Sequence, residues 1–120
     1  MTKLNQKFDL EERTAKFGGE VIELCKKVTG NVIIFPIIDQ LIRAGTSVGA
    51  NYCEANGASS KKDFRNKIFI CKKEAKEAQY WFRMLAKAVE KEEIKNECRK
   101  LWQEAKELSK IFAVIAIKTE

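Results

Sequence analysis

The chain has 120 residues, with 23 lysines and arginines, 17 aspartates and glutamates and no histidine, so its formal charge at pH 7 is +6. This length suits one compact domain over residues 1–120 and is too short for two domains of ordinary size. The lack of histidine, with four cysteines that form no C-x-x-C pair, argues against a metal site. The positive charge favours an anionic partner, such as nucleic acid or an acidic protein surface.

The cysteines and the chain ends bear on the compartment. Cys25, Cys53, Cys71 and Cys98 are far apart, which predicts free thiols used as small core residues in a reducing cytosol. The first residues lack the pattern of a signal peptide, and the apolar run at 111–117 is far shorter than the roughly 20 residues that span a bilayer. We therefore expect a soluble, cytoplasmic protein with no membrane role.

The first helix is predicted to begin at Asp9. Asp9 with Glu12 three residues later resembles a capping box, and Phe8 is placed as the preceding staple residue. Apolar residues then recur at heptad-like spacing until the break at residues 29–31.

The second helix is predicted to start around Pro36, which suits a first turn because its missing N–H does no harm there. It should finish near Asn56, with Gly57 as a left-handed stop. Ser60 with Asp63 predicts a capped start for the third helix.

The third helix is predicted from Lys61 to about Glu90, since no glycine or proline interrupts that stretch and apolar residues lie three or four apart. The same spacing from Ile94 to Ile115 predicts a fourth helix. Four amphipathic helices with short connections predict an all-α fold, an up-down-up-down antiparallel four-helix bundle.

A basic ridge follows the third helix. At about 100° per residue, five basic side chains fall within roughly 60° of one another. This ridge is either a solvated face or a row of phosphate contacts. With the neighbouring Lys62, the candidate nucleic-acid contacts are Lys61, Lys62, Arg65, Lys72, Lys76 and Arg83.

Several large apolar residues point away from both the core stripe and the ridge. Ile70, Trp81 and Met84 do so on the third helix, and Trp102 lies off the core line of the fourth. A monomeric bundle has no use for so many, so these four are candidate interface residues of a homo-oligomer.

The second helix carries glycines and a polar line. Gly45 and Gly49 permit close approach by a neighbouring helix. The polar line has spacings of four, four and three, and is either an internal hydrogen-bond and ion-pair network or a surface that faces a partner. Its members are Arg43, Ser47, Asn51 and Glu54.

Catalytic chemistry has little support. Ser47 is a possible nucleophile and Glu54 a possible acid or base, but no histidine can activate the serine. Glu74 and Glu77 lack the E-x-x-H pairs of di-metal bundles. We therefore expect no catalytic residue, no metal, no cofactor and no small-molecule substrate.

The stretch QLIRAGTSVGANYCEANGASSKKDFRNKIFICKKEAKEAQYWFRML, residues 40–85, resembles a known family. Its pattern is Q-x-x-R-[AS]-x-[TS]-S-x-x-A-N-x-x-E-A, then S-K-K-[DE]-F, then K-E-A-x-E-x-x-Y-W-x-R-x-L. The family is that of small bacterial four-helix-bundle proteins associated with intervening sequences in 23S ribosomal RNA genes. Besides the polar line, the matching residues are Lys61, Lys62, Asp63, Phe64, Glu74, Glu77, Tyr80, Trp81 and Arg83.

The resemblance implies a left-handed bundle assembled as a ring-like homopentamer. It also implies kinship with the accessory variability proteins of diversity-generating retroelements, basic pentamers that bind a reverse transcriptase and its RNA. The implied partner is therefore RNA or a reverse-transcriptase-like nucleoprotein. The family offers no catalytic role that could be carried over.

Besides an enzyme that uses Glu54 or Glu74, which has the least support, two functional hypotheses follow. The first is a non-enzymatic oligomeric accessory module whose basic ridge binds RNA or a nucleoprotein. The alternative is a protein–protein interaction scaffold that docks a partner helix through the apolar stripe around Trp81, with no nucleic-acid role.

Overall fold

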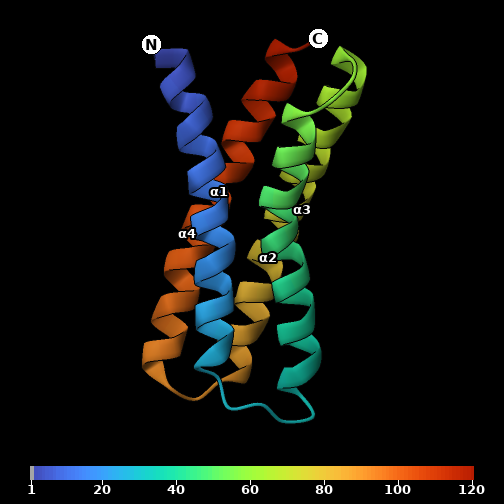
Figure 1. Cartoon of the computed structure of the whole chain (residues 1–120). Coiled ribbons are helices and arrows are strands. Elements are labelled where there is room, and N and C mark those ends of the chain that lie inside the picture. The colour runs from blue at the N-terminus through green and yellow to red at the C-terminus, as the bar shows by residue number, and fades with distance from the viewer. Residues whose placement is uncertain (1) are drawn as a thin grey trace.

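The computed structural model describes the backbone of residues 2–120 and the side chains of residues 10–120. The helices in chain order are α1 (Thr2–Lys26), α2 (Ile34–Asn56), α3 (Lys61–Ala88) and α4 (Glu92–Lys118). They run alternately down and up, joined by short loops at the two ends of the molecule (Figure 1). The predicted all-α, up-down-up-down four-helix bundle is confirmed. No helix in the described part of the chain is long and apolar enough to cross a membrane.

The start of α1 differs from the prediction. The helix already runs from Thr2, so Asp9 lies inside it and does not cap it. A D-x-x-E spacing also places two side chains on one face within a helix, so the motif does not by itself mark a start. Leu10, which is buried, extends the apolar stripe one turn above Thr14 and Phe17. The side chains of Phe8 and Asp9 lie outside the described residues.

The ends of α2 and the start of α3 follow the sequence signals with one exception. Pro36 lies in the first turn of α2 as predicted, while the Asn31 side-chain oxygen accepts hydrogen bonds from the N–H groups of Ile33 and Ile34, both at 2.9 Å. The helix ends at Asn56, but Gly57 has φ −98°, so the predicted left-handed stop is wrong. The Ser60 hydroxyl accepts from the Asp63 N–H at 3.0 Å, which confirms the predicted cap of α3.

The core runs along the bundle axis and takes side chains from all four helices. Three phenylalanines from three helices are its largest fully buried members, and the rings of Phe17 and Phe82 meet edge to face at 6.1 Å. The Tyr52 ring lies 5.9 Å from that of Phe112. α3 packs along both α2 and α4, whereas α1 packs mainly on α2 and only lightly on α4. α3 is therefore the central helix of the packing.

Small residues bring α1 and α2 close together. A Cβ at Gly45 would lie 2.8 Å from Val21 Cγ2, and one at Gly49 would lie 3.3 Å from Thr14 Oγ1. Gly18 of α1 faces this contact across from Gly45. The glycines of the second helix thus serve close helix packing, as the sequence suggested.

Three of the four cysteines are core residues as predicted, but the prediction is wrong for Cys53, whose side chain is exposed. Cys25, Cys71 and Cys98 are buried and Cys53 is exposed, and all four are free. The Cys71 thiol donates to the Val48 carbonyl at 3.5 Å. Burial raises the pKa of Cys25 and Cys98 to about 11 and the pKa of Cys71 to about 12.

Replacing Gly45 with alanine should destabilise the protein by about 1–2 kcal/mol, because overpacking against Val21 outweighs the gain in helix propensity. Gly19→Ala is the matched control. An added Cβ there meets nothing within 4 Å, so that variant should be more stable by about 0.5–1 kcal/mol. Urea unfolding measures both values, and equal changes would contradict the close-packing account.

The buried thiols should make the fold sensitive to alkali. Between pH 9 and about 11 an unfolded thiol loses its proton while the buried one keeps it, so unfolding releases protons and the free energy of unfolding falls as pH rises. In Cys71→Ala the stability lost between pH 8 and pH 10 should be smaller than in the unchanged protein, and urea unfolding at the two pH values measures it. The two proteins differ only at residue 71, so an identical loss would refute the thiol contribution.

Candidate nucleic-acid interface

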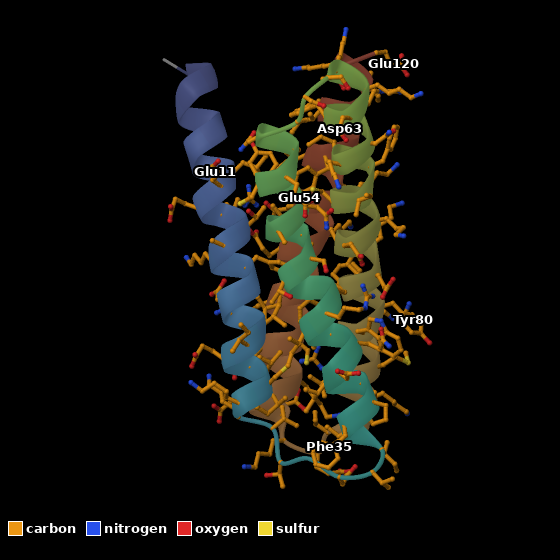
Figure 2. The ribbon with its side chains drawn as sticks, turned by 45° about the vertical axis from the view of Figure 1, so that its right-hand side comes forward. Glu11, Phe35, Glu54, Asp63, Tyr80 and Glu120 are labelled. Carbon is orange, nitrogen blue, oxygen red and sulfur yellow. The ribbon has the colours of Figure 1, made fainter. Side chains whose placement is uncertain are left out.

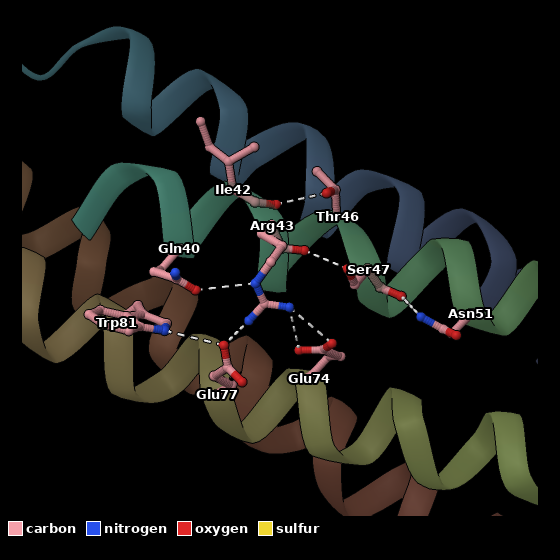
Figure 3. A network of polar contacts seen from close by, with 9 residues as sticks. All are labelled: Gln40, Ile42, Arg43, Thr46, Ser47, Asn51, Glu74, Glu77 and Trp81. Atoms are coloured by element: carbon pink, nitrogen blue, oxygen red, sulfur yellow. Dashed lines mark hydrogen bonds and ion pairs between the residues drawn. The ribbon is translucent and has the colours of Figure 1, made fainter. Parts of the chain in front are cut away.

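Arg43 of α2 reaches across to α3 and binds two carboxylates (Figure 3). Its Nη1 donates to both Glu74 oxygens at 3.2 and 3.1 Å, and its Nη2 pairs with Glu77. The Gln40 side-chain oxygen accepts from Arg43 Nε at 3.2 Å, and Trp81 Nε1 donates to Glu77 at 3.4 Å. Glu74 is only 8% exposed, so its charge needs this partner. The cluster fixes the seam between α2 and α3.

The rest of the predicted polar line does not join this cluster through its side chains. Ser47 Oγ donates to the Arg43 carbonyl at 2.6 Å, and Asn51 Nδ2 donates to the Ser47 carbonyl at 2.9 Å. Glu54 instead accepts from Lys67 Nζ of α3 at 2.8 Å, and this hydrogen bond raises the pKa of Lys67. Two members therefore bind the backbone of their own helix, while Arg43 and Glu54 tie α2 to α3.

The carboxylates of α4 are directed toward α1. Glu104 accepts a two-pronged contact from Arg13 at 2.7 and 2.8 Å, and Glu107 pairs with the same guanidinium at 3.0 Å. Glu97 pairs with Lys27 at 2.9 Å. These hydrogen bonds raise the pKa of both cations above their ordinary values. Acidic side chains of α3 and α4 thus lie in the α2–α3 and α1–α4 seams, where they pair with basic side chains.

The seam between α3 and α4 is instead basic. Arg65 Nε donates to the Ala116 carbonyl at 3.1 Å, and Lys61 Nζ donates to the Glu120 main-chain oxygen at 3.3 Å. From the other helix, Lys95 Nζ donates to the Ala86 carbonyl at 2.8 Å. Arg65, which contacts α4, lies on the same side of α3 as Lys72, Lys76 and Arg83. The predicted ridge therefore borders α4.

Five of the six predicted contacts form no ion pair with a described side chain, and the exception is Arg65. Lys61 and Arg65 are engaged with the end of α4, and Arg65 also pairs with the Glu120 carboxylate at 3.1 Å. Among the described side chains, the ion pairs include none of Lys62, Lys72, Lys76 and Arg83. Lys72 is half-buried and the other three are exposed. We call Lys72, Lys76 and Arg83 of α3 with Lys95, Arg99 and Lys106 of α4 the basic face.

A groove of about 560 Å³ opens in the basic face between α3 and α4. Its apolar lining comes from Phe82, Ala86, Cys98 and Trp102, and its polar lining comes from Arg83, Arg99 and Gln103. The Lys106 ammonium lies 5.4 Å from the centre of the Trp102 ring. Neither Arg99 nor the groove was predicted from the sequence. The repeat of Lys95, Arg99, Lys106 and Lys110 along one side of α4 is the signal that could have found this half of the face.

The four predicted interface residues do not form one surface. Ile70, Trp81, Met84 and Trp102 are all half-buried, and both tryptophans pack against the core. Trp81 belongs to the α2–α3 seam and Trp102 to the α3–α4 groove. Among residues 10–120, the exposed large apolar side chains are those of Ile22, Val32, Ile33, Phe35, Phe69, Tyr80, Val114 and Ile117. Figure 2 shows Tyr80 projecting from the side of the bundle.

The described residues hold no cluster of three or more histidine, cysteine, aspartate or glutamate side chains that could bind a metal ion.

Removing the Arg43 guanidinium should cost about 2 kcal/mol of unfolding free energy in Arg43→Met, because Glu74 then keeps a buried charge without its partner; the half-exposed arginine keeps the loss below that of a fully buried pair. Arg99→Met is the matched control, since its pair with Glu92 is exposed, and should change stability by less than about 0.5 kcal/mol. Urea unfolding measures both. Similar losses in the two variants would show that the cluster does not stabilise the seam.

Comparisons with known proteins agree with this architecture. The sequence profile of a family described as 23S rRNA-intervening sequence protein matches residues 6–114. A crystal structure of a protein of unknown function from the S23 ribosomal protein family of Bacteroides thetaiotaomicron is 30% identical, with a TM-score of 0.78, and the match covers 89% of this chain and 97% of that one. No curated protein is significantly similar. The chain, matched over nearly its whole length, therefore belongs to the 23S rRNA-intervening sequence protein family.

Proposed function

We propose that this protein is a non-enzymatic, oligomeric accessory module that binds RNA, alone or within a nucleoprotein, through the basic face. The observation that carries the proposal is the separation of charge. Carboxylates of α3 and α4 pair across the two other seams, whereas five of the six members of the basic face have no carboxylate partner among the described side chains and only Arg99 pairs, with Glu92 of its own helix.

A polyanion suits this arrangement better than a single acidic group. Lys72, Lys76 and Arg83 extend along α3 over roughly 16 Å at 1.5 Å per residue. Cations in such a row contact successive phosphates without reading bases. The name of the family, which refers to an intervening sequence of 23S rRNA, supports RNA as the polyanion.

The proposal assigns no reaction because the candidate catalytic groups are occupied structurally. The Ser47 hydroxyl donates to its own helix, and the Glu54 and Glu74 carboxylates pair with Lys67 and Arg43. A nucleophile or general base needs a free partner or a substrate within reach. These groups instead hold α2 against α3.

Self-association is supported by apolar side chains that the single chain leaves in solvent. Phe69 and Tyr80 of α3 are 40% and 52% exposed, and Val114 and Ile117 of α4 are 49% and 68% exposed. Large apolar residues in such number on two adjacent helices favour burial against another copy. The ring of five remains the expectation set by the resemblance.

A protein scaffold is the second candidate. The exposed Tyr80 ring lies 5.0 Å from that of Trp81 in an edge-to-face arrangement, which offers an aromatic surface to a partner helix. On this account the Tyr80–Trp81 pair would matter and the basic face would not.

Reversing two charges on the basic face should weaken binding of a structured RNA. In Lys72→Glu/Lys76→Glu we expect about ten-fold or more lower affinity at moderate salt. The slope of log affinity against log salt concentration should be shallower by about two units. The control is Lys16→Glu/Lys100→Glu, which changes net charge equally at exposed lysines beside the α1–α4 seam and should bind within about three-fold of the unchanged protein. Filter binding over a salt series measures both.

Equal losses of affinity in the two double variants would contradict the assignment of RNA binding to the basic face. If the unchanged protein retained no RNA on the filter, RNA binding itself would be contradicted. Light scattering coupled to size exclusion on the same samples tests assembly. We expect a particle of several chains that takes up RNA at low salt and releases it as salt rises. A monomer would contradict the oligomer, and an assembly that ignores RNA but captures a partner protein through Tyr80 would support the scaffold.

A further inference from the structure

The groove between α3 and α4 has an apolar floor inside a cationic rim. Phe82 and Cys98 are each 1% exposed and close it from below. The small Ala86 side chain of α3 and the large Trp102 ring of α4 also line it. A volume of about 560 Å³ lies within the range of sites that enclose small ligands. The space can therefore hold a flat apolar group of the size of a nucleobase.

The rim selects for negative charge beside that apolar group. Arg83 and Arg99 line the groove from opposite helices, and Lys106 lies over the Trp102 ring. Arg99 is held by Glu92 and Asn96 at the helix surface, and Arg83 is exposed with no ion pair among the described side chains. Gln103 adds an amide that can both donate and accept at the edge of a base. An apolar ring beside phosphate is the chemistry that this lining fits.

We propose that the α3–α4 groove receives one unpaired nucleotide of a bound RNA, with its base against Trp102 and its flanking phosphates at Arg83 and Arg99. This inference rests on the proposed function, because it places one nucleotide of the RNA that the basic face holds. Aromatic side chains commonly stack unpaired bases, whereas the bases of a duplex are hidden in their own stack. The basic face would then prefer single-stranded segments, loops or bulges over continuous duplex.

The continuity of charge favours RNA over an acidic protein as the occupant. Lys72 and Lys76 lead along α3 to Arg83 at the groove, so a strand whose phosphates follow this row arrives at the opening. A docked helix would need a longer apolar stripe, because the apolar lining of the groove consists of only four residues, Phe82, Ala86, Cys98 and Trp102. The repeated negative charge of a nucleic acid matches the whole row.

Tryptophan fluorescence can report the contact directly. The chain has two tryptophans, so Trp81→Phe leaves Trp102 as the single emitter. We expect a short single-stranded oligoribonucleotide to quench this emission at low salt, and a duplex of the same sequence to quench it far less. The affinity of each is measured in the same titration.

Two variants test the groove without relying on one substitution. Trp102→Ala should lower affinity for the single strand about ten-fold, and Ala86→Leu, which fills the groove and changes no charge, should lower it similarly. The matched control is Trp81→Ala, which removes the half-buried tryptophan of the other seam and should bind within about two-fold. Circular dichroism establishes folding of each variant, and Ala86→Leu decides the matter where Trp102→Ala is unfolded.

The outcomes separate this inference from the proposed function. Salt-dependent binding that falls in Lys72→Glu/Lys76→Glu but is unchanged in Trp102→Ala and Ala86→Leu would overturn the groove and leave RNA binding standing. Absence of binding to every oligonucleotide would overturn both. Quenching of Trp102 emission by an acidic helical peptide and not by RNA would overturn the proposal that a nucleotide occupies the groove and would favour a protein as its occupant.

Discussion

The pairing of carboxylates across two seams is the constraint from which the charge pattern of this bundle follows. A glutamate as buried as Glu74 must meet a cation, and Arg43 is the residue that reaches it from α2. Arg13 does the same for Glu104 from α1. Each contact joins neighbouring helices and also places a negative charge outside the seam between α3 and α4. Structural stabilisation and the accumulation of positive charge therefore have a common cause.

Packing explains why α3 carries both stabilising ion pairs and accumulated positive charge. It lies along both α2 and α4, so one of its sides pairs with α2 while the opposite side borders α4. The glycines of α2 serve the remaining contact, since Gly45 lies against Val21 of α1. With α1 on one side and α3 on the other, α2 is placed so that Arg43 faces α3. The polar cluster depends on this placement.

The two tryptophans illustrate how similar residues acquire different environments. Both are half-buried and pack against the core. The Trp81 indole donates to Glu77 and so belongs to the ion-pair cluster, whereas Trp102 lines an apolar groove beside three cations. The groove beside Trp102 offers space for a ligand. The two tryptophans, which were predicted from the sequence to share one interface, therefore have different proposed roles.

The amino-acid sequence correctly predicted the fold class, the cap at Ser60 and the helix boundaries to within a few residues, except at the start of α1. It did so because helical periodicity and capping are local, and each can be recognised within a few turns of chain. It also identified the family and the basic ridge of α3. The position of Asp9 inside α1 shows the limit of a local motif, since D-x-x-E fits a helix interior as well as a start.

The seam that each charged side chain enters depends on how the helices pack against one another. Arg43 and Glu74 are 31 residues apart, and Arg13 and Glu104 are 91 apart, so neither pair has a local signature. The groove likewise requires Arg83 and Trp102 from two helices, which meet only when α3 and α4 pack antiparallel. The spacing of residues along one helix sets the direction of a side chain, but its partner depends on which helix lies beside it.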